Sequence, residues 1–160
     1  MNEEVIRAQL VDVLTGEHAH IQLDAALKGL PRKDRGQRRG AHSIWEILEH
    51  MRLAQEDIIR YTFDPTWKSA KWPEGYWPKR PVPTDAEWSA SVKSFRKDLD
   101  ELVAFVRDPK TDLTARFPHG EGRTYLRQVL LVADHNAYHL GQLVQVRKQL
   151  AAANKKRKKG

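Results

Sequence analysis

The sequence predicts an all-α protein, a four-helix bundle with one short extra helix and one long loop rich in tryptophan and proline. Three observations lead to this fold class. Apolar residues recur at helical spacing through most of the chain, and no segment shows a convincing strand pattern. Helix start and stop signals divide the chain into four long periodic segments and one short one. A length of 160 residues suits a single domain with its own hydrophobic core.

The first two predicted helices cover residues 2–14 and 20–29. Gly16 interrupts the apolar pattern between them. Gly29 and Pro31 end the second helix, because neither residue type continues a helix well. The charged and glycine-containing segment that follows is predicted to be a loop.

Two capping boxes mark the starts of the next two long helices, over 44–62 and 85–108. In each box a hydroxyl residue stands three positions before a glutamate, so that each side chain can bond the backbone N–H of the other residue. The pairs are Ser43 with Glu46 and Thr84 with Glu87. The second of these helices ends before Pro109.

The segment between them, residues 64–83, has no hydrophobic period and is rich in proline and tryptophan. Long irregular segments in compact domains are often functional. Trp72, Tyr76 and Trp77 are therefore predicted to line a ligand pocket or form a lid over it.

The last helix is predicted over 124–151, so the domain is expected to span residues 1–151, with a basic, disordered tail over 152–160. The net charge is +7, and five positive charges fall in "NKKRKKG" at the end. Without them the chain carries only +2, which is not typical of a DNA-binding face. We expect no specific nucleic-acid partner.

Cysteine is absent, which excludes disulfides, thiolate ligands and a cysteine nucleophile. No stretch reaches the roughly 20 apolar residues of a membrane span, and the first residues lack the order of a signal peptide. We expect a cytoplasmic protein with no membrane association.

The stretch "DHNAYHLGQL" places His135 and His139 one turn apart on an apolar face of the last helix. This spacing suits chelation of one metal ion, although two ordinary histidines would have the same pattern. His50 lies at the border of an apolar face of its own helix. Three buried imidazoles would be costly without a partner, and a shared metal ion offsets that cost. Imidazole ligands suit Zn²⁺, Ni²⁺, Cu²⁺ or Fe²⁺ and disfavour Mg²⁺ and Ca²⁺.

At "HSIWEILEHMRLAQEDI" and "DHNAYHLGQLVQVRKQL" the chain resembles the DinB/YfiT-like superfamily of metal-binding four-helix bundles, and the likeness covers nearly all of residues 1–150. The resemblance implies that His50, His135 and His139 ligate a divalent metal ion, Zn or Ni. It also implies a cytoplasmic protein, often dimeric.

Members of that superfamily include metal- and thiol-dependent transferases and a thiol-dependent isomerase. The resemblance therefore favours a metal-dependent enzyme of the thiol-dependent transferase type that uses a low-molecular-weight thiol and a small-molecule substrate. A metal-dependent hydrolase and a non-catalytic metal-binding stress-response protein are the alternatives. No carboxylate has an evident place as a base for water, which weakly favours thiol chemistry.

His20 is a candidate acid, base or supporting residue, and the alternative is a histidine that merely starts a helix. Asn136 and Gln142 are candidates to bond the second ring nitrogen of a ligand. The other histidines, His18, His42 and His119, are expected to be solvated.

A second apolar stripe runs along the last helix, through Leu126, Leu130, Ala133, Ala137, Leu140 and Val144. Either a neighbouring helix of the same bundle or the same stripe of a second chain can cover it. Its length favours the second arrangement, so a homodimer is expected.

Overall fold

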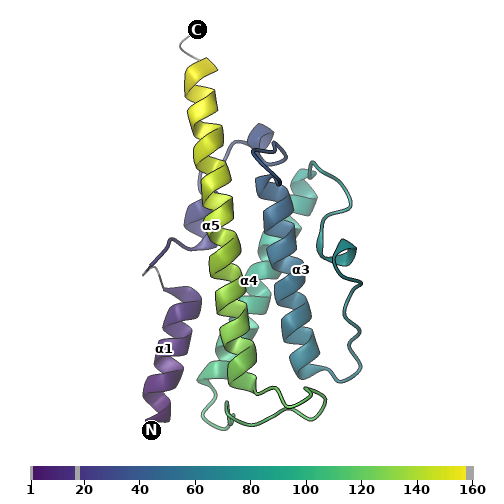
Figure 1. Cartoon of the computed structure of the whole chain (residues 1–160). Coiled ribbons are helices and arrows are strands. Elements are labelled where there is room, and N and C mark those ends of the chain that lie inside the picture. Colours follow the sequence, from purple (N-terminus) through teal and green to yellow (C-terminus); the bar gives the residue numbers. More distant parts are fainter. Residues whose placement is uncertain (1, 17–18, 158–160) are drawn as a thin grey trace.

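A computed structural model of the chain describes residues 2–16 and 19–157, and no strand occurs within them (Figure 1). The predicted all-α fold is confirmed. The elements in chain order are α1 (Glu3–Thr15), α2 (Leu23–Leu27), η1 (Arg32–Asp34), α3 (Ile44–Phe63), η2 (Glu74–Tyr76), α4 (Asp85–Arg107) and α5 (Tyr125–Arg157).

Both predicted capping boxes are present. The Ser43 hydroxyl accepts from the backbone N–H of Glu46 at 3.2 Å, and the Glu46 carboxylate accepts from the backbone N–H of Ser43 at 2.8 Å. Thr84 and Glu87 exchange the same two bonds at the start of α4. Because these bonds satisfy N–H groups that have no partner inside the helix, they set the first residue of each helix.

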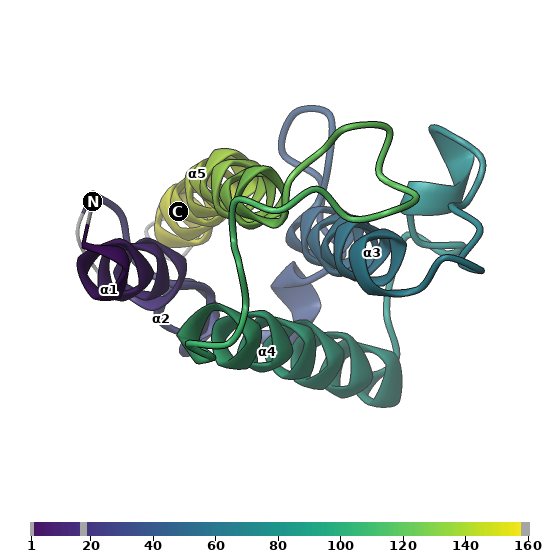
Figure 2. The ribbon, with the colours of Figure 1, turned by 90° about the horizontal axis from the view of Figure 1, so that it is seen from below.

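The four long helices form the bundle. Seen from one end, α1, α5, α3 and α4 surround a common centre (Figure 2). Helix α3 packs against both α4 and α5, α1 packs against the same two helices, and the short α2 packs on α5. The loop over residues 64–83 runs along the outer side of α3 (Figure 1).

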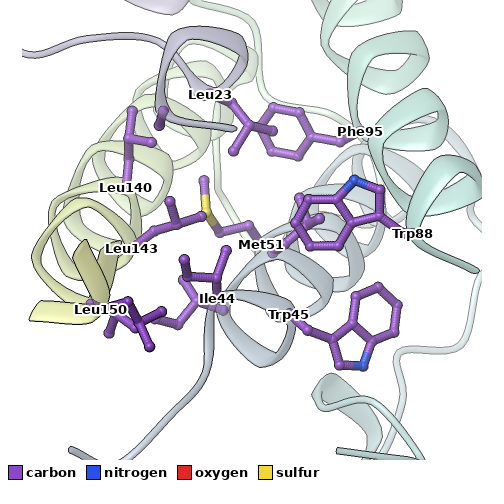
Figure 3. Close-up of a cluster of buried hydrophobic side chains, with 13 residues drawn as sticks. Leu23, Ile44, Trp45, Met51, Trp88, Phe95, Leu140, Leu143 and Leu150 are labelled. Atoms are coloured by element: carbon purple, nitrogen blue, oxygen red, sulfur yellow. The ribbon is translucent and has the colours of Figure 1, made fainter. Parts of the chain in front are cut away.

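Two clusters of buried side chains fill the centre of the bundle. In the first, Leu143 of α5 lies near Met51 of α3, with Trp88 and Phe95 of α4 on the opposite side (Figure 3). The second cluster joins α1, α3, α4 and α5 through Leu10, Leu14, Ile59, Leu102, Val103, Val106, Leu113, Val129 and Val132. Burial of each large apolar side chain contributes roughly 1.5–3 kcal/mol, so these clusters hold the helices together.

Helix α5 is longer than predicted, because it continues to Arg157. Residues 152–157, which were expected to belong to a disordered tail, are helical. Alanines at 151–153 and lysines beyond them are good helix formers, and a helix end that projects from the bundle needs no apolar face. Residues 158–160 of the expected tail lie outside the described residues.

Most of the second apolar stripe of α5 is covered by the chain itself. Leu126 and Ala133 pack against the second cluster, which includes residues of α1, and Leu140 belongs to the first cluster, which includes residues of α2. Within the stripe, Leu130 is 48% exposed. The stripe therefore gives no support for a dimer, and the homodimer stays a prediction. None of the helices in the described part of the chain is long and apolar enough to cross a bilayer.

Candidate metal centre

Three histidines meet between α3 and α5. The Nε2 atom of His50 lies 3.2 Å from Nε2 of His139 and 3.3 Å from Nε2 of His135. One ring nitrogen from each of the three residues lies within 4.8 Å of the others. His50 is 2% exposed, and the other two are half-buried. The predicted juxtaposition of His50 with the pair one turn apart on α5 is thus present in the fold.

In two of these rings, those of His50 and His139, the other nitrogen, Nδ1, forms a hydrogen bond to an oxygen. Each of these oxygens can only accept a hydrogen bond. His50 donates from Nδ1 to the backbone carbonyl of Tyr76 at 3.0 Å, and His139 donates from Nδ1 to the side-chain oxygen of Gln142 at 3.1 Å. In a neutral imidazole with its proton on Nδ1, Nε2 carries a lone pair. The lone pairs of His50 and His139 therefore face each other at 3.2 Å with no proton between them.

This arrangement fits a shared metal ion. Two nitrogens that each lie about 2.1 Å from one ion are about 3.0–3.4 Å apart when they subtend roughly 90–110° at it. Both of the close Nε2 distances, 3.2 and 3.3 Å, fall in this interval. Nδ1 of His135 is buried and has no hydrogen-bond partner. The group can therefore hold a metal ion through three ring nitrogens.

The surroundings keep the three rings neutral, which is the form that ligates a metal. Burial lowers the pKa of His135 to about 4, and the neighbouring His139 and His50 rings add to the shift. Burial also lowers the pKa values of His50 and His139. At neutral pH no proton has to leave the rings before a cation can bind.

The metal-free protein is accordingly expected to lose stability as the pH falls from about 6.5 towards about 4. In this window the unfolded chain protonates these histidines while the folded chain does not, so the unfolded state binds more protons and its population grows. Urea denaturation in the presence of a chelator at pH 7 and pH 5 measures the effect. His135→Gln should reduce the pH dependence, and His20→Gln, at an exposed histidine, should keep it. Equal pH dependence in wild type and His135→Gln would contradict the burial of a neutral ring.

The loop over 64–83 reaches the group through Tyr76 and Trp77. Trp77 stacks on the His50 ring with 4.4 Å between ring centroids and 13° between planes. Tyr76 is buried and donates from its hydroxyl to Asp57 at 2.8 Å, while its carbonyl accepts from His50. Burial, together with the hydrogen bond to Asp57, raises the pKa of the Tyr76 phenol to about 12. Trp72 is 68% exposed and contacts the Tyr76 ring, with 5.4 Å between ring centroids, so its place in a pocket or lid stays a prediction.

Asp57 anchors this loop to α3, a role that the sequence does not suggest. Its carboxylate accepts from the indole N–H of Trp67 and from the Tyr76 hydroxyl, both at 2.8 Å. Asp57 lies seven residues after His50, two turns along the same helix, so one face of α3 holds both the ring and the loop that orients it. The partner of His50 is a backbone carbonyl, which every residue carries, so the sequence could not identify it.

The other candidate residues divide clearly. Gln142 bonds a ligand ring as predicted, whereas Asn136 donates to the buried Gln55 at 2.8 Å. His20 is exposed, bonds the carbonyl of Ile21, and is not brought to the group. Its role as an acid or base stays a prediction.

The expectation that His42 and His119 are solvated is wrong. His42 is half-buried and stacks on Trp77 at 4.2 Å, because the loop before α3 folds against the loop after it. His119 is also half-buried and bonds the carbonyl of Tyr61 at 2.6 Å. His18 lies outside the described residues.

Trp77 also lines a cavity of about 440 Å³ between α3, α4 and residues 75–80. Trp45, Arg52 and Ser91 line the same cavity. The volume lies within the range of small-molecule sites. One aromatic side chain is thus shared between this cavity and the ring of His50.

One comparison with known protein families gives a match. The sequence profile of the DinB superfamily matches residues 16–143, a span that contains His50, His135 and His139. No curated protein and no solved structure gives a match. Because the matched span covers most of the 160 residues, the chain belongs to the DinB superfamily.

Proposed function

We propose that the chain binds one divalent transition-metal ion, Zn²⁺ or Ni²⁺, through Nε2 of His50, His135 and His139. The observation that carries this proposal is the 3.2 Å approach of two ring nitrogens whose protons are held elsewhere. Neutral imidazoles are good ligands for both ions, whereas Mg²⁺ and Ca²⁺ prefer oxygen.

We further propose that the chain is a thiol-dependent transferase and that the bound ion takes part in its reaction. Three protein ligands leave a coordination position open, and a divalent ion lowers the pKa of a thiol or water placed beside it. The chain's own residues orient the site: Tyr76 and Gln142 hold the ring protons of His50 and His139, and Trp77 covers one face of His50. The cavity that shares Trp77 is the proposed place for a small-molecule substrate.

Two carboxylates of α3, those of Asp57 and Glu49, are engaged in other contacts, which favours thiol over water as the nucleophile. Both oxygens of Asp57 accept hydrogen bonds from the loop, and Glu49 pairs with Arg52 at 2.7 Å. Within the described residues, no carboxylate joins the histidine group to act as a base for water. A thiol needs no such base once its pKa is lowered, because its proton can leave to solvent.

Adding 2-mercaptoethanol to the Co²⁺-substituted protein is expected to produce a new near-ultraviolet absorption band from the bond between sulfur and cobalt. Ethylene glycol, which carries a hydroxyl in place of the thiol, should produce none. Absence of the band in a protein that binds Co²⁺ fully would remove the thiol from the proposal while leaving the metal in place. A hydrolase or a non-catalytic metal protein would then be favoured.

A further inference from the structure

Positive charge is concentrated in two short segments that are far apart in the sequence. Residues 28–43 and 147–156 contain ten of the 28 lysines and arginines and one of the 21 acidic residues. By sequence alone, the excess positive charge was predicted to lie in the tail. In the fold, the basic end of α5 lies beside the basic loop over residues 28–43.

The two segments lie at the same end of the bundle. The Asn154 side chain of α5 donates to the Asp34 carboxylate in η1 at 2.9 Å. About two turns of helix before that bond, Arg147 donates to the backbone carbonyls of Ala25 at 3.2 Å and Lys28 at 2.5 Å. The end of α5 projects beyond the rest of the bundle next to this loop (Figure 1). Hydrogen bonds at both ends thus hold the basic loop beside the basic helix.

Some of these cations form ion pairs with carboxylates of the same chain. Arg32 and Arg35 both pair with Asp85, and Arg38 pairs with Glu46. These pairs fix the loop to the starts of α3 and α4. Among the described residues, six further cations at this end are exposed and have no ion pair with a carboxylate: Lys28, Lys33, Arg39, Lys148, Lys155 and Lys156.

We propose that this surface, the basic end, binds the phosphate backbone of double-stranded nucleic acid without sequence preference. Closely spaced phosphates are the partner for several unpaired cations on one surface, since each contact releases a bound counterion. The large exposed aromatic residues of the described chain, Trp72 and Tyr138, lie outside both segments, so the basic end offers no platform for unstacked bases.

An anionic membrane fits this surface less well. Insertion into a bilayer needs exposed apolar side chains beside the cations. The exposed large hydrophobic residues lie outside the two segments, although Val82 lies beside Gly36 of the basic loop. The proposal is also independent of the metal, because Lys155 is sixteen residues beyond His139, about 24 Å along the helix.

Fluorescence anisotropy with two short labelled duplexes of unrelated sequence tests the proposal across a series of salt concentrations. Both duplexes should bind equally, with an affinity that falls as salt rises. K155Q/K156Q should weaken binding about tenfold or more near 0.1 M salt and reduce the slope of log K against log salt by about 1.8. K33Q/R39Q, on the loop, should weaken binding in the same way.

The matched control is K93Q/K97Q, which removes the same charge from exposed positions of α4 and should bind like wild type. Equal losses in all three double variants would overturn the proposal in favour of net charge alone. Wild-type binding by K33Q/R39Q would overturn the joint surface. Binding to phosphatidylserine vesicles without binding to either duplex would overturn the choice of partner. Metal content should be unchanged in every variant, so a failure of the metal proposal is detected separately.

Discussion

His135→Ala is expected to abolish metal binding at metal concentrations that saturate the wild type. The substitution removes one of three proposed ligands, and the expected loss of affinity exceeds the roughly 10–100-fold cost of losing a residue that only supports a ligand. His50→Ala and His139→Ala should behave alike, because the three ring nitrogens lie within 4.8 Å of one another. Elemental analysis of purified protein after dialysis against metal at a concentration that saturates the wild type gives the stoichiometry.

The same variants should lose the stabilisation that comes from the metal. Free metal at about 100 times the dissociation constant stabilises the wild type by about 2.7 kcal/mol, and a protein that does not bind gains nothing. His20→Ala is the matched control, since this histidine is exposed and outside the group. Full metal occupancy in any one of the three variants would remove that residue from the proposed site.

Leu143→Ala is expected to destabilise the protein by about 2–5 kcal/mol, the usual cost of a large-to-small change in a packed core. Leu143 is 0% exposed and belongs to the first cluster, where α5 meets α3 (Figure 3). The neighbouring helices cannot close the space fully, so contacts and apolar burial are both lost. Urea denaturation of the metal-free protein gives the change in the free energy of unfolding.

Leu130→Ala, on the same helix, is the matched control and should change stability by about 0.5 kcal/mol or less, because Leu130 is 48% exposed. A loss as large as that of Leu143→Ala would indicate that Leu130 is covered by another molecule, as the predicted homodimer requires. Light scattering on the wild type would then decide between one chain and two.

Much of the fold could be predicted because its signals are local. The capping boxes at Ser43 and Thr84 and the stop before Pro109 depend on residues within one turn of each other, and the helices begin and end close to the predicted positions. The end of α5 was predicted too early, since a helix that projects from the bundle carries no apolar pattern to mark it.

It was harder to predict which parts of the chain cover a given apolar stripe or side chain. Periodicity showed that α5 has two apolar stripes, but the choice between a second chain and the chain's own helices depends on where α1 and α2 lie. Likewise, the sequence placed His42 in a loop and predicted that it is solvated. It is half-buried against Trp77 because two loops contact each other.

The sequence by itself determined the helical bundle and the three histidines of the candidate centre, because a helix puts residues one turn apart on one face and ligand chemistry belongs to the side chain. Only the tertiary structure determined which atoms orient those rings. It also determined that the cations without an ion pair lie together at the basic end. The carbonyl of Tyr76, the anchor at Asp57 and the meeting of Asp34 with Asn154 join segments separated along the chain. Such contacts follow from the packing of whole helices, so no local pattern records them.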